Sequence, residues 1–154
     1  MYRLCCRYVK DQPEAEDILV RGFYKVFRSI ASFHYQDDTK LSAWVRRIMV
    51  NECLMQLRQA IHFNFVLLTQ ETDFADQAST DVESNLSAED IYALLLELPV
   101  SHRTIFNLFV IEGFSHREIA EQLEISEEVS RSQLSRAKAM LRAILTKNDI
   151  RNAI

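Results

Sequence analysis

The sequence contains few of the residues that end helices and form the tight turns of sheets. It has only two Gly and two Pro among 154 residues, too few for the many turns of a barrel or a sandwich. Gly22 and Gly113 stand far apart, which excludes a P-loop and a G-x-G-x-x-G nucleotide-binding motif. Because 48% of the residues are hydrophobic, the chain can bury a core. We therefore expect an all-α fold made of two small helical domains.

Cysteines and long apolar runs are also scarce. Cys5 and Cys6 are adjacent and Cys53 stands alone, a spacing that fits neither a disulfide framework nor metal ligands, so we expect three small core residues. No apolar run approaches the roughly 20 residues of a membrane span, and the first residues lack the pattern of a signal peptide. The four histidines are scattered, without a catalytic arrangement of neighbours. We expect a cytoplasmic protein without enzymatic activity, cofactor, metal or direct membrane insertion.

Basic residues are absent from the middle of the chain. Residues 60–98 hold eight acidic residues and no Lys or Arg, whereas residues 1–59 sum to +3 and residues 99–154 to +1. The whole-chain charge of −4, which argues against a nucleic-acid partner, therefore conceals two mildly basic ends. Residues 69–87 are mostly acidic and small polar residues, the composition of a linker. We predict the following domains: 1–60, an acidic linker 61–87, 88–147 and a tail 148–154.

The start of the predicted linker has its own pattern. Residues 61–65 alternate apolar and polar side chains and run into the apolar residues 66–68. This alternation predicts a short extended segment that docks on a surface. The sequence leaves open whether that surface belongs to the chain itself or to a partner.

Three helices are expected in the first domain. Apolar residues recur at helical spacing within residues 2–10, and Pro13 suits the first position of a second helix. The apolar stripe predicted for that helix comprises Ala15, Ile18, Leu19, Phe23, Val26, Phe27 and Ile30. A third helix begins near Leu41 or Ser42, and its predicted buried positions are Leu41, Trp44, Val45, Ile48, Met49, Leu54 and Leu57.

The third helix is basic and follows a polar loop with aromatic residues. Residues 40–58 carry a local charge of +3, because the four basic residues Lys40, Arg46, Arg47 and Arg58 outweigh the single acid Glu52. Phe33 and Tyr35 lie in the loop, and Trp44 lies near the start of the helix. Basic side chains attract phosphates and aromatic rings stack on bases, which together are the components of single-strand binding. A solvated basic helix with a core tryptophan remains the alternative.

The second domain has the pattern of a helix-turn-helix. Ser87 caps its first helix, and Pro99 begins its second. The residues expected to face the core are Ile91, Leu94, Leu95, Leu98, Ile105, Phe106, Leu108, Phe109 and Val110. Ser115 and Glu118 have the spacing of a capping box, and Ser126 caps a final long helix after a three-residue turn. In such a motif the second helix enters the major groove of DNA. The residues expected on its outer face are Arg131, Ser132, Ser135, Arg136 and Lys138. A merely solvated basic helix is the alternative.

Two stretches together resemble the bacterial extracytoplasmic-function (ECF) sigma factors of the sigma-70 family. Residues 2–58 resemble sigma region 2 and residues 94–145 resemble sigma region 4, about 110 of 154 residues. The motifs that carry the resemblance are residues 2–8, 16–19, 22–23, 41–51, 98–99, Arg103, 106–108, 112–115, 118–120 and 132–138. The pairing of both regions in this order is more specific than either region alone.

The resemblance implies a promoter-recognition subunit that binds core RNA polymerase and promoter DNA. It implies contacts with core polymerase by Asp17, Val20, Arg21 and Phe23. It implies contacts with the unpaired −10 strand by Lys40, Trp44, Arg46, Arg47, Asn51 and Arg58. It implies contacts with the −35 element by Arg131, Ser132, Gln133, Ser135, Arg136 and Lys138. The acidic linker is expected to follow the path of nascent RNA, and an anti-sigma factor is a further partner of the family.

Some positions depart from the family pattern. Val20 and Arg21 replace the usual Gln-Glu pair, Met55 stands where Asp is common, and Glu124 replaces a frequent turn Gly, which costs strain if φ is positive. The chain also starts where the family already has a preceding helix, so we expect that helix to be missing or truncated. Two alternatives stay open, a helix-turn-helix regulator that binds duplex DNA without polymerase and a degenerate sigma factor that binds only proteins.

Overall fold

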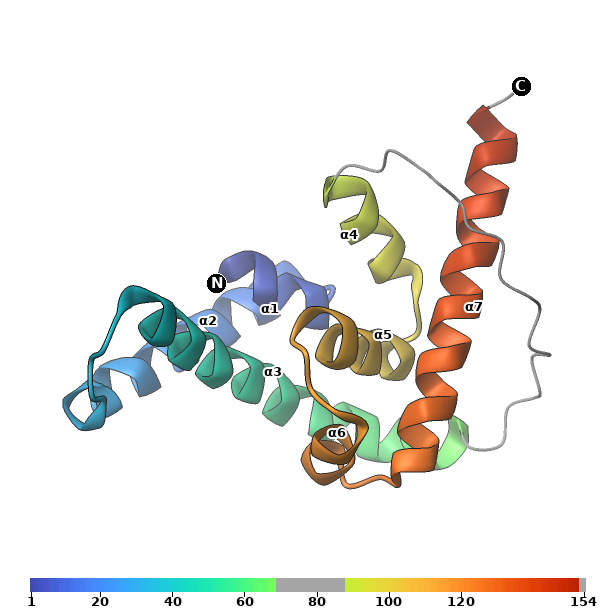
Figure 1. Cartoon of the computed structure of the whole chain (residues 1–154). Coiled ribbons are helices and arrows are strands. Elements are labelled where there is room, and N and C mark those ends of the chain that lie inside the picture. Colours follow the sequence, from blue (N-terminus) through green and yellow to red (C-terminus); the bar gives the residue numbers. More distant parts are fainter. Residues whose placement is uncertain (69–87, 153–154) are drawn as a thin grey trace. The chain divides into compact units, whose positions relative to one another are not determined.

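The chain divides into two compact units, Met1–Asn64 and Phe65–Ile154. The computed structural model describes the backbone of residues 1–68 and 88–152, and the side chains of residues 1–58 and 90–146 (Figure 1). Within these residues the chain forms seven α-helices and no strand, which confirms the all-α prediction. Most of the predicted acidic linker, residues 69–87, lies outside the described residues.

The first unit is built from three helices. They are α1 (Tyr2–Tyr8), α2 (Gln12–Ser29) and α3 (Asp38–Leu68), with a short 3-10 turn η1 (Ile30–Ser32) after α2. The carboxylate of Asp11 caps α2 by accepting a hydrogen bond from the backbone N of Glu14 at 3.1 Å. Pro13 lies in the first turn of α2, where its missing N–H costs no helical hydrogen bond.

Helix α3 is longer than the sequence predicts. It starts at Asp38, where Asp37 Oδ1 accepts a hydrogen bond from the backbone N of Lys40 at 2.8 Å, and continues to Leu68. The prediction of an extended segment at residues 61–65 is therefore wrong. No Gly or Pro occurs in residues 38–68, and helix propagation adds one hydrogen bond for each residue fixed, so nothing in the sequence stops the helix before Leu68.

The core of the first unit lies where the three helices meet. Its buried apolar residues are Leu4, Cys5, Tyr8, Val9, Ala15, Ile18, Val26, Met49, Val50, Cys53, Leu54 and Leu57. A Cβ atom on Gly22 would clash with the side chain of Met49, so Gly22 leaves the space that this side chain of α3 occupies. Cys5 and Cys53 are fully buried as expected, while Cys6 is half-buried. A hydrogen bond with Cys53 lowers the pKa of the Cys5 thiol.

The buried face of α2 differs from the predicted apolar stripe. It runs through Ala15, Ile18, Gly22 and Val26, whereas Phe23, Phe27 and Ile30 are 37%, 72% and 45% exposed. Each residue turns a helix by about 100°, so the large apolar residues that follow Gly22 and Val26 lie on the neighbouring face. The prediction that these three side chains are buried is wrong.

The second unit contains the four remaining helices. They are α4 (Ala88–Glu97), α5 (Val100–Phe106), α6 (His116–Leu123) and α7 (Glu127–Asn152), and the π-helical segment η2 (Asn107–Ile111) extends α5. Figure 1 shows α5 beside α7, with which it makes its most extensive contact. The core cluster comprises Leu95, Leu98 and Ala137, with Phe106, Ile111, Met140 and Leu141 packed against it. Helix α7 continues beyond residue 147, where the sequence predicts the domain to end.

Two predicted core residues of the second unit are exposed. Ile91 is 46% and Val110 is 48% exposed. In η2 the backbone N of Glu112 donates to the carbonyl of Asn107 at 2.9 Å, a five-residue step that adds a residue to the turn and rotates Val110 outward. Gly113 then ends the segment with φ of 77°, a backbone conformation that glycine adopts without strain.

Arg103 is the largest fully buried side chain of the molecule's described residues. It is 1% exposed, and its Nη1 donates to the carbonyl of Leu98 at 3.1 Å. Burial lowers the pKa of the Arg103 guanidinium. A buried cation in this position supplies donors to the carbonyl groups that the end of α4 leaves without a helical partner.

Candidate nucleic-acid interface

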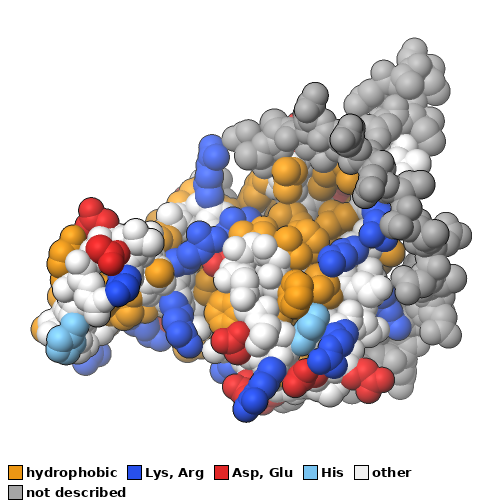
Figure 2. Space-filling model, viewed as in Figure 1, with side chains coloured by type: hydrophobic (Ala, Val, Ile, Leu, Met, Phe, Trp, Pro, Cys, Tyr) orange, Lys and Arg blue, Asp and Glu red, His pale blue; other side chains and the backbone are white. Residues whose placement is uncertain are grey.

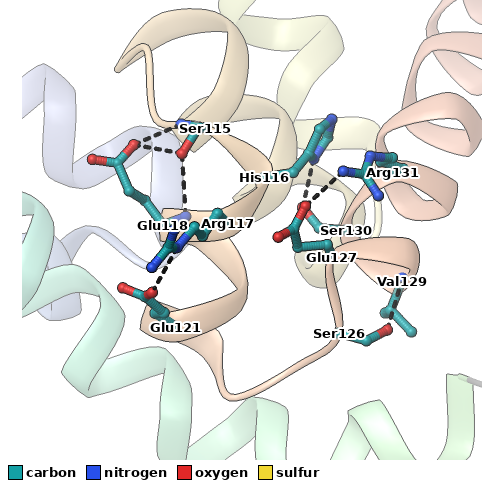
Figure 3. Close-up of polar contacts among 10 residues, drawn as sticks. All are labelled: Ser115, His116, Arg117, Glu118, Glu121, Ser126, Glu127, Val129, Ser130 and Arg131. Carbon is teal, nitrogen blue, oxygen red and sulfur yellow. Dashed lines mark hydrogen bonds and ion pairs between the residues drawn. The ribbon is translucent and has the colours of Figure 1, made fainter.

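The second unit contains the predicted helix-turn-helix. Ser115 Oγ accepts from the backbone N of Glu118 at 3.3 Å, and Glu118 Oε2 accepts from the backbone N of Ser115 at 2.8 Å (Figure 3). This capping box starts α6. Ser126 Oγ accepts from the backbone N of Val129 at 3.1 Å and so caps α7. The structure confirms both predicted caps and the tight turn between them.

Helix α7 presents a polar and basic face. Four of the predicted DNA contacts on α7 are exposed, Arg131, Ser132, Ser135 and Lys138. We call these four residues the basic face of α7. Arg136 is half-buried at the edge of this face. Arginine can bind guanine through two hydrogen bonds, and Ser, Arg and Lys side chains can bind phosphates. The arrangement therefore suits contact with a DNA groove.

Gln133 does not belong to the basic face of α7. It is 3% exposed, because it lies three residues after Ser130 and four before Ala137, both of which are fully buried. Positions with these spacings share one side of a helix. The contact of Gln133 with the −35 element therefore stays a prediction from the resemblance, and the burial of this side chain does not support it.

Side chains from three elements meet at the start of α7. His116 Nδ1 and Ser130 Oγ are 2.9 Å apart, and the imidazole stacks on Phe109 with ring centroids 4.4 Å apart. Arg131 Nη2 donates to Glu127 Oε2 at 2.6 Å (Figure 3). Burial, followed by the charge of Arg131, lowers the pKa of His116. Acidic and basic side chains accordingly alternate over α6 and the start of α7 (Figure 2).

A second histidine of this unit is buried beneath Arg136. His102 is 6% exposed, and its Nδ1 lies 3.2 Å from Ser101 Oγ. Burial lowers the pKa of His102 most, and the positive charge of Arg136 lowers it further. The imidazole is therefore stabilised in its neutral form beside the basic face of α7.

In the first unit, α3 exposes a basic surface opposite the core. The exposed members of the predicted −10 set are Lys40, Arg47, Asn51 and Arg58, while Trp44 and Arg46 are half-buried. Trp44 stacks on Phe33, with ring centroids 4.7 Å apart and an interplanar angle of 29°. The structure thus brings an aromatic residue of the polar loop against the start of the basic helix. An aromatic pair beside exposed cations is the combination that single-strand binding requires.

Helix α2 exposes large apolar side chains. We call Val20, Phe23, Tyr24 and Phe27 the apolar stripe of α2. These residues are 68%, 37%, 61% and 72% exposed, respectively. Asp17 and Arg21, the other predicted polymerase contacts, are also exposed. Arg21 Nη2 donates to Gln56 Oε1 of α3 at 2.8 Å. A contiguous exposed apolar surface on a soluble protein usually marks an interaction site.

Polar side chains link α2 and α3, contacts that the sequence does not predict. Lys25 forms an ion pair with Glu52, whose side chain is only 3% exposed. Gln56 Nε2 donates to Glu14 Oε1 at 2.9 Å. Glu52 lies three residues after the buried Met49, and a charged group on a buried face requires a partner. That signal was present in the sequence, although it does not identify Lys25 as the partner.

No group of three or more His, Cys, Asp or Glu side chains is placed to hold a metal ion within the described residues. None of the helices in the described part of the chain is both long and apolar enough to cross a membrane.

Comparison with known proteins identifies two domains of one family. The family model described as Sigma-70 region 2 matches residues 1–61, and that described as Sigma-70, region 4 matches residues 88–141. The chain is 32% identical to the ECF RNA polymerase sigma factor SigE of Mycolicibacterium smegmatis over 158 residues. That match covers 99% of this chain and 60% of the relative, so the chain spans about three fifths of the relative's length.

Further relatives and a solved structure agree with these matches. The chain is 29% identical to the ECF RNA polymerase sigma factor SigM of Mycobacterium tuberculosis, covering 94% of this chain and 71% of that one. The fold resembles that of the sigma factor RpoE from Bartonella quintana, solved in complex with the anti-sigma factor NepR. The TM-score is 0.57 at 21% identity, over 94% of this chain and 89% of that chain. The chain therefore belongs to the extracytoplasmic-function sigma factors of the sigma-70 family.

Proposed function

We propose that the chain binds core RNA polymerase and directs it to promoters. In this proposal α3 captures the unpaired −10 strand, and the basic face of α7 reads the −35 element in the major groove. The observation that carries the proposal is the presence of two exposed basic helices in two separate units, within sigma regions 2 and 4 in their family order. The sigma-70 family is not a family of enzymes, which agrees with the expectation from the scattered histidines.

The apolar stripe of α2 supports a protein partner in addition to DNA. Apolar side chains with 37–72% exposure gain little from contact with a charged nucleic-acid backbone, but they become buried against another protein. We assign this surface, together with Asp17, to core polymerase. An anti-sigma factor is a second proposed partner, because the RpoE structure contains one.

A helix-turn-helix regulator that binds duplex DNA without polymerase is the competing function. It accounts for α6 and α7, but it gives no role to the stacked Phe33 and Trp44 beside the exposed Asn51. Reconstitution of the full chain with core polymerase, followed by promoter-driven transcription, separates the two functions. A sigma factor forms a complex with core and supports initiation at specific promoters. DNA binding by the free chain without any association with core would instead establish the regulator.

Arg136→Ala tests the proposed −35 surface. We expect promoter affinity of the reconstituted holoenzyme to fall about tenfold, since losing a bidentate base contact typically costs about 1–3 kcal/mol. The loss should shrink on a promoter with a scrambled −35 element. Arg142→Ala, an exposed position further along α7, removes the same charge and serves as the control. Equal affinities of wild type and Arg136→Ala across salt concentrations would show that Arg136, at the edge of the basic face of α7, does not read the −35 element.

A further inference from the structure

Glu127 occupies a distinctive place at the start of α7. It is the first residue of this helix, and its carboxylate contacts the guanidinium of Arg131 at 2.6 Å (Figure 3). Both side chains are exposed, 41% for Glu127 and 60% for Arg131. An exposed pair of residues four apart on a helix contributes very little to stability. The ion pair therefore contributes little to the stability of the helix.

The pair lies where a carboxylate is unfavourable for DNA binding. In a helix-turn-helix, the N-terminal part of the second helix contacts base edges, and a negative side chain there repels the phosphates on both sides of the groove. Glu127 opens α7, and Arg131 is the first residue of its basic face. The contact neutralises the carboxylate while it restricts the arginine.

The contact also leaves much of the guanidinium available. Arginine carries five N–H donors in a rigid planar fork, and the bond to Glu127 is made by Nη2 alone. His116, held by Ser130 and stacked on Phe109, lies close to this pair (Figure 3). A long and flexible side chain is thereby held in a restricted geometry before DNA binds, which lowers the entropy lost in a directional base contact.

We infer that Glu127 is a positioning residue that sets the base selectivity of Arg131. It orients the guanidinium toward base edges and keeps it from pairing with the nearest phosphate. This inference rests on the proposed function of α7 as the −35 reader. Without Glu127, Arg131 can rotate to a phosphate, where it adds affinity for any sequence and discriminates less among bases.

The test compares Glu127→Gln with Glu128→Gln in the full chain bound to core polymerase. Both substitutions remove one negative charge from the first turn of α7, but only the first removes the ionic partner of Arg131 and weakens this contact. The measurement is competition binding and transcription on a promoter set that carries every single substitution of the −35 element. Arg131→Ala identifies the base pair whose discrimination depends on that arginine.

At that base pair we expect Glu127→Gln to lower discrimination about fivefold, a partial loss of a bidentate contact. Glu128→Gln should leave discrimination unchanged, and both variants should bind non-promoter DNA somewhat more tightly because each carries one less negative charge. In the Arg131→Ala background, Glu127→Gln should have no further effect on discrimination, because the two side chains act as one unit.

Two results would overturn the inference alone. The first is an equal loss of discrimination in Glu127→Gln and Glu128→Gln, which would mean that only charge matters. The second is a full effect of Glu127→Gln in the Arg131→Ala background, which would mean that Glu127 reads a base itself. A wild-type chain that neither binds core polymerase nor supports transcription would overturn the proposed function and the inference with it.

Discussion

Glu124 ends α6 in the left-handed region, with φ of 57° and ψ of 44°. It is the only non-glycine residue with positive φ among the described residues. The sequence suggested strain at this position, and the structure confirms the conformation that produces it. For an L-residue with a Cβ atom, this backbone conformation costs roughly 1–2 kcal/mol.

Glu124→Gly should stabilise the second unit by about 0.5–1 kcal/mol, since the relief of strain exceeds the extra chain entropy that glycine gives the unfolded state. Amide hydrogen exchange in α6 and α7 measures the change. Glu121→Gly, made within α6, should destabilise the same unit by about 1 kcal/mol. A loss of stability in Glu124→Gly comparable to that of Glu121→Gly would contradict the assignment of strain.

His102 gives the second unit a pH-dependent stability. Because burial and Arg136 lower its native pKa below the ordinary 6.5, the unfolded chain binds a proton at a higher pH than the folded chain does. The contribution of the neutral imidazole is complete above about pH 6.5 and is lost as pH falls through the lower native pKa. The pKa of His116 is lowered in the same direction, so the two histidines act together.

Replacing His102 with Gln should reduce the loss of stability of the second unit between pH 7.5 and pH 5.5. The readout is protection of α5 and α7 amides from hydrogen exchange, corrected for the intrinsic rate at each pH. His34→Gln, an exposed position in the first unit, should leave that loss unchanged. An identical pH dependence in wild type and His102→Gln would show that His102 does not couple to folding.

At the scale of helices, the sequence predicts well those helix ends and caps that depend on local chemistry. The capping box of Ser115 and Glu118, the cap at Ser126 and the break at Gly113 depend on a few neighbouring residues, so their spacing is sufficient. The burial of α2 depends instead on which face meets α3. Gly22 leaves space on that face for the side chain of Met49, and small residues at a helix contact carry no hydrophobic signal.

In the candidate site, too, features set by local sequence patterns could be predicted, and features set by tertiary packing could not. Basic and polar residues at helical spacing correctly place Arg131, Ser132 and Ser135 on an exposed face. Family resemblance alone added Gln133, and the packing of α7 buries it. The ion pair of Lys25 with Glu52 could not be derived, because it joins two helices and depends on tertiary geometry. The pair of Glu127 and Arg131 has the i,i+4 spacing of one helix, which the sequence does show.

The apolar stripe of α2 supports a prediction at the scale of one element. Phe27→Ser replaces a side chain that is 72% exposed, so the stability of the first unit should change by less than about 0.5 kcal/mol. Affinity for core polymerase should fall about tenfold, as expected when an aromatic anchor is lost from an interface. Fluorescence of Trp44, the single tryptophan, reports the stability.

Met55→Ser is the matched control for Phe27→Ser, since Met55 is 53% exposed but lies on α3. It should bind core polymerase like the wild type. If both substitutions weaken core binding equally, the effect is not specific to α2. If neither does, the apolar stripe of α2 does not contact polymerase.

At the scale of the whole molecule, positive and negative charges are concentrated in different segments of the chain. The chain ends that contain the two basic helices sum to +3 and +1, whereas residues 60–98 contribute −8. Nonspecific DNA affinity depends on net charge close to the phosphates, and a tethered anionic segment competes with them for the same cations. The distribution therefore predicts weak DNA binding by the free chain.

Replacing Glu71, Asp73, Asp76, Asp81 and Glu83 with their amides tests this competition, since it changes the net charge from −4 to +1. We expect the free variant to bind a non-promoter duplex about tenfold more tightly at low salt, as measured by fluorescence anisotropy. The difference should close as salt rises, because screening shortens the range of the linker charges. A variant with residues 69–87 shuffled but all acids retained should bind like the wild type. Unchanged affinity of the amide variant at low salt would show that the acidic segment does not restrain the basic helices.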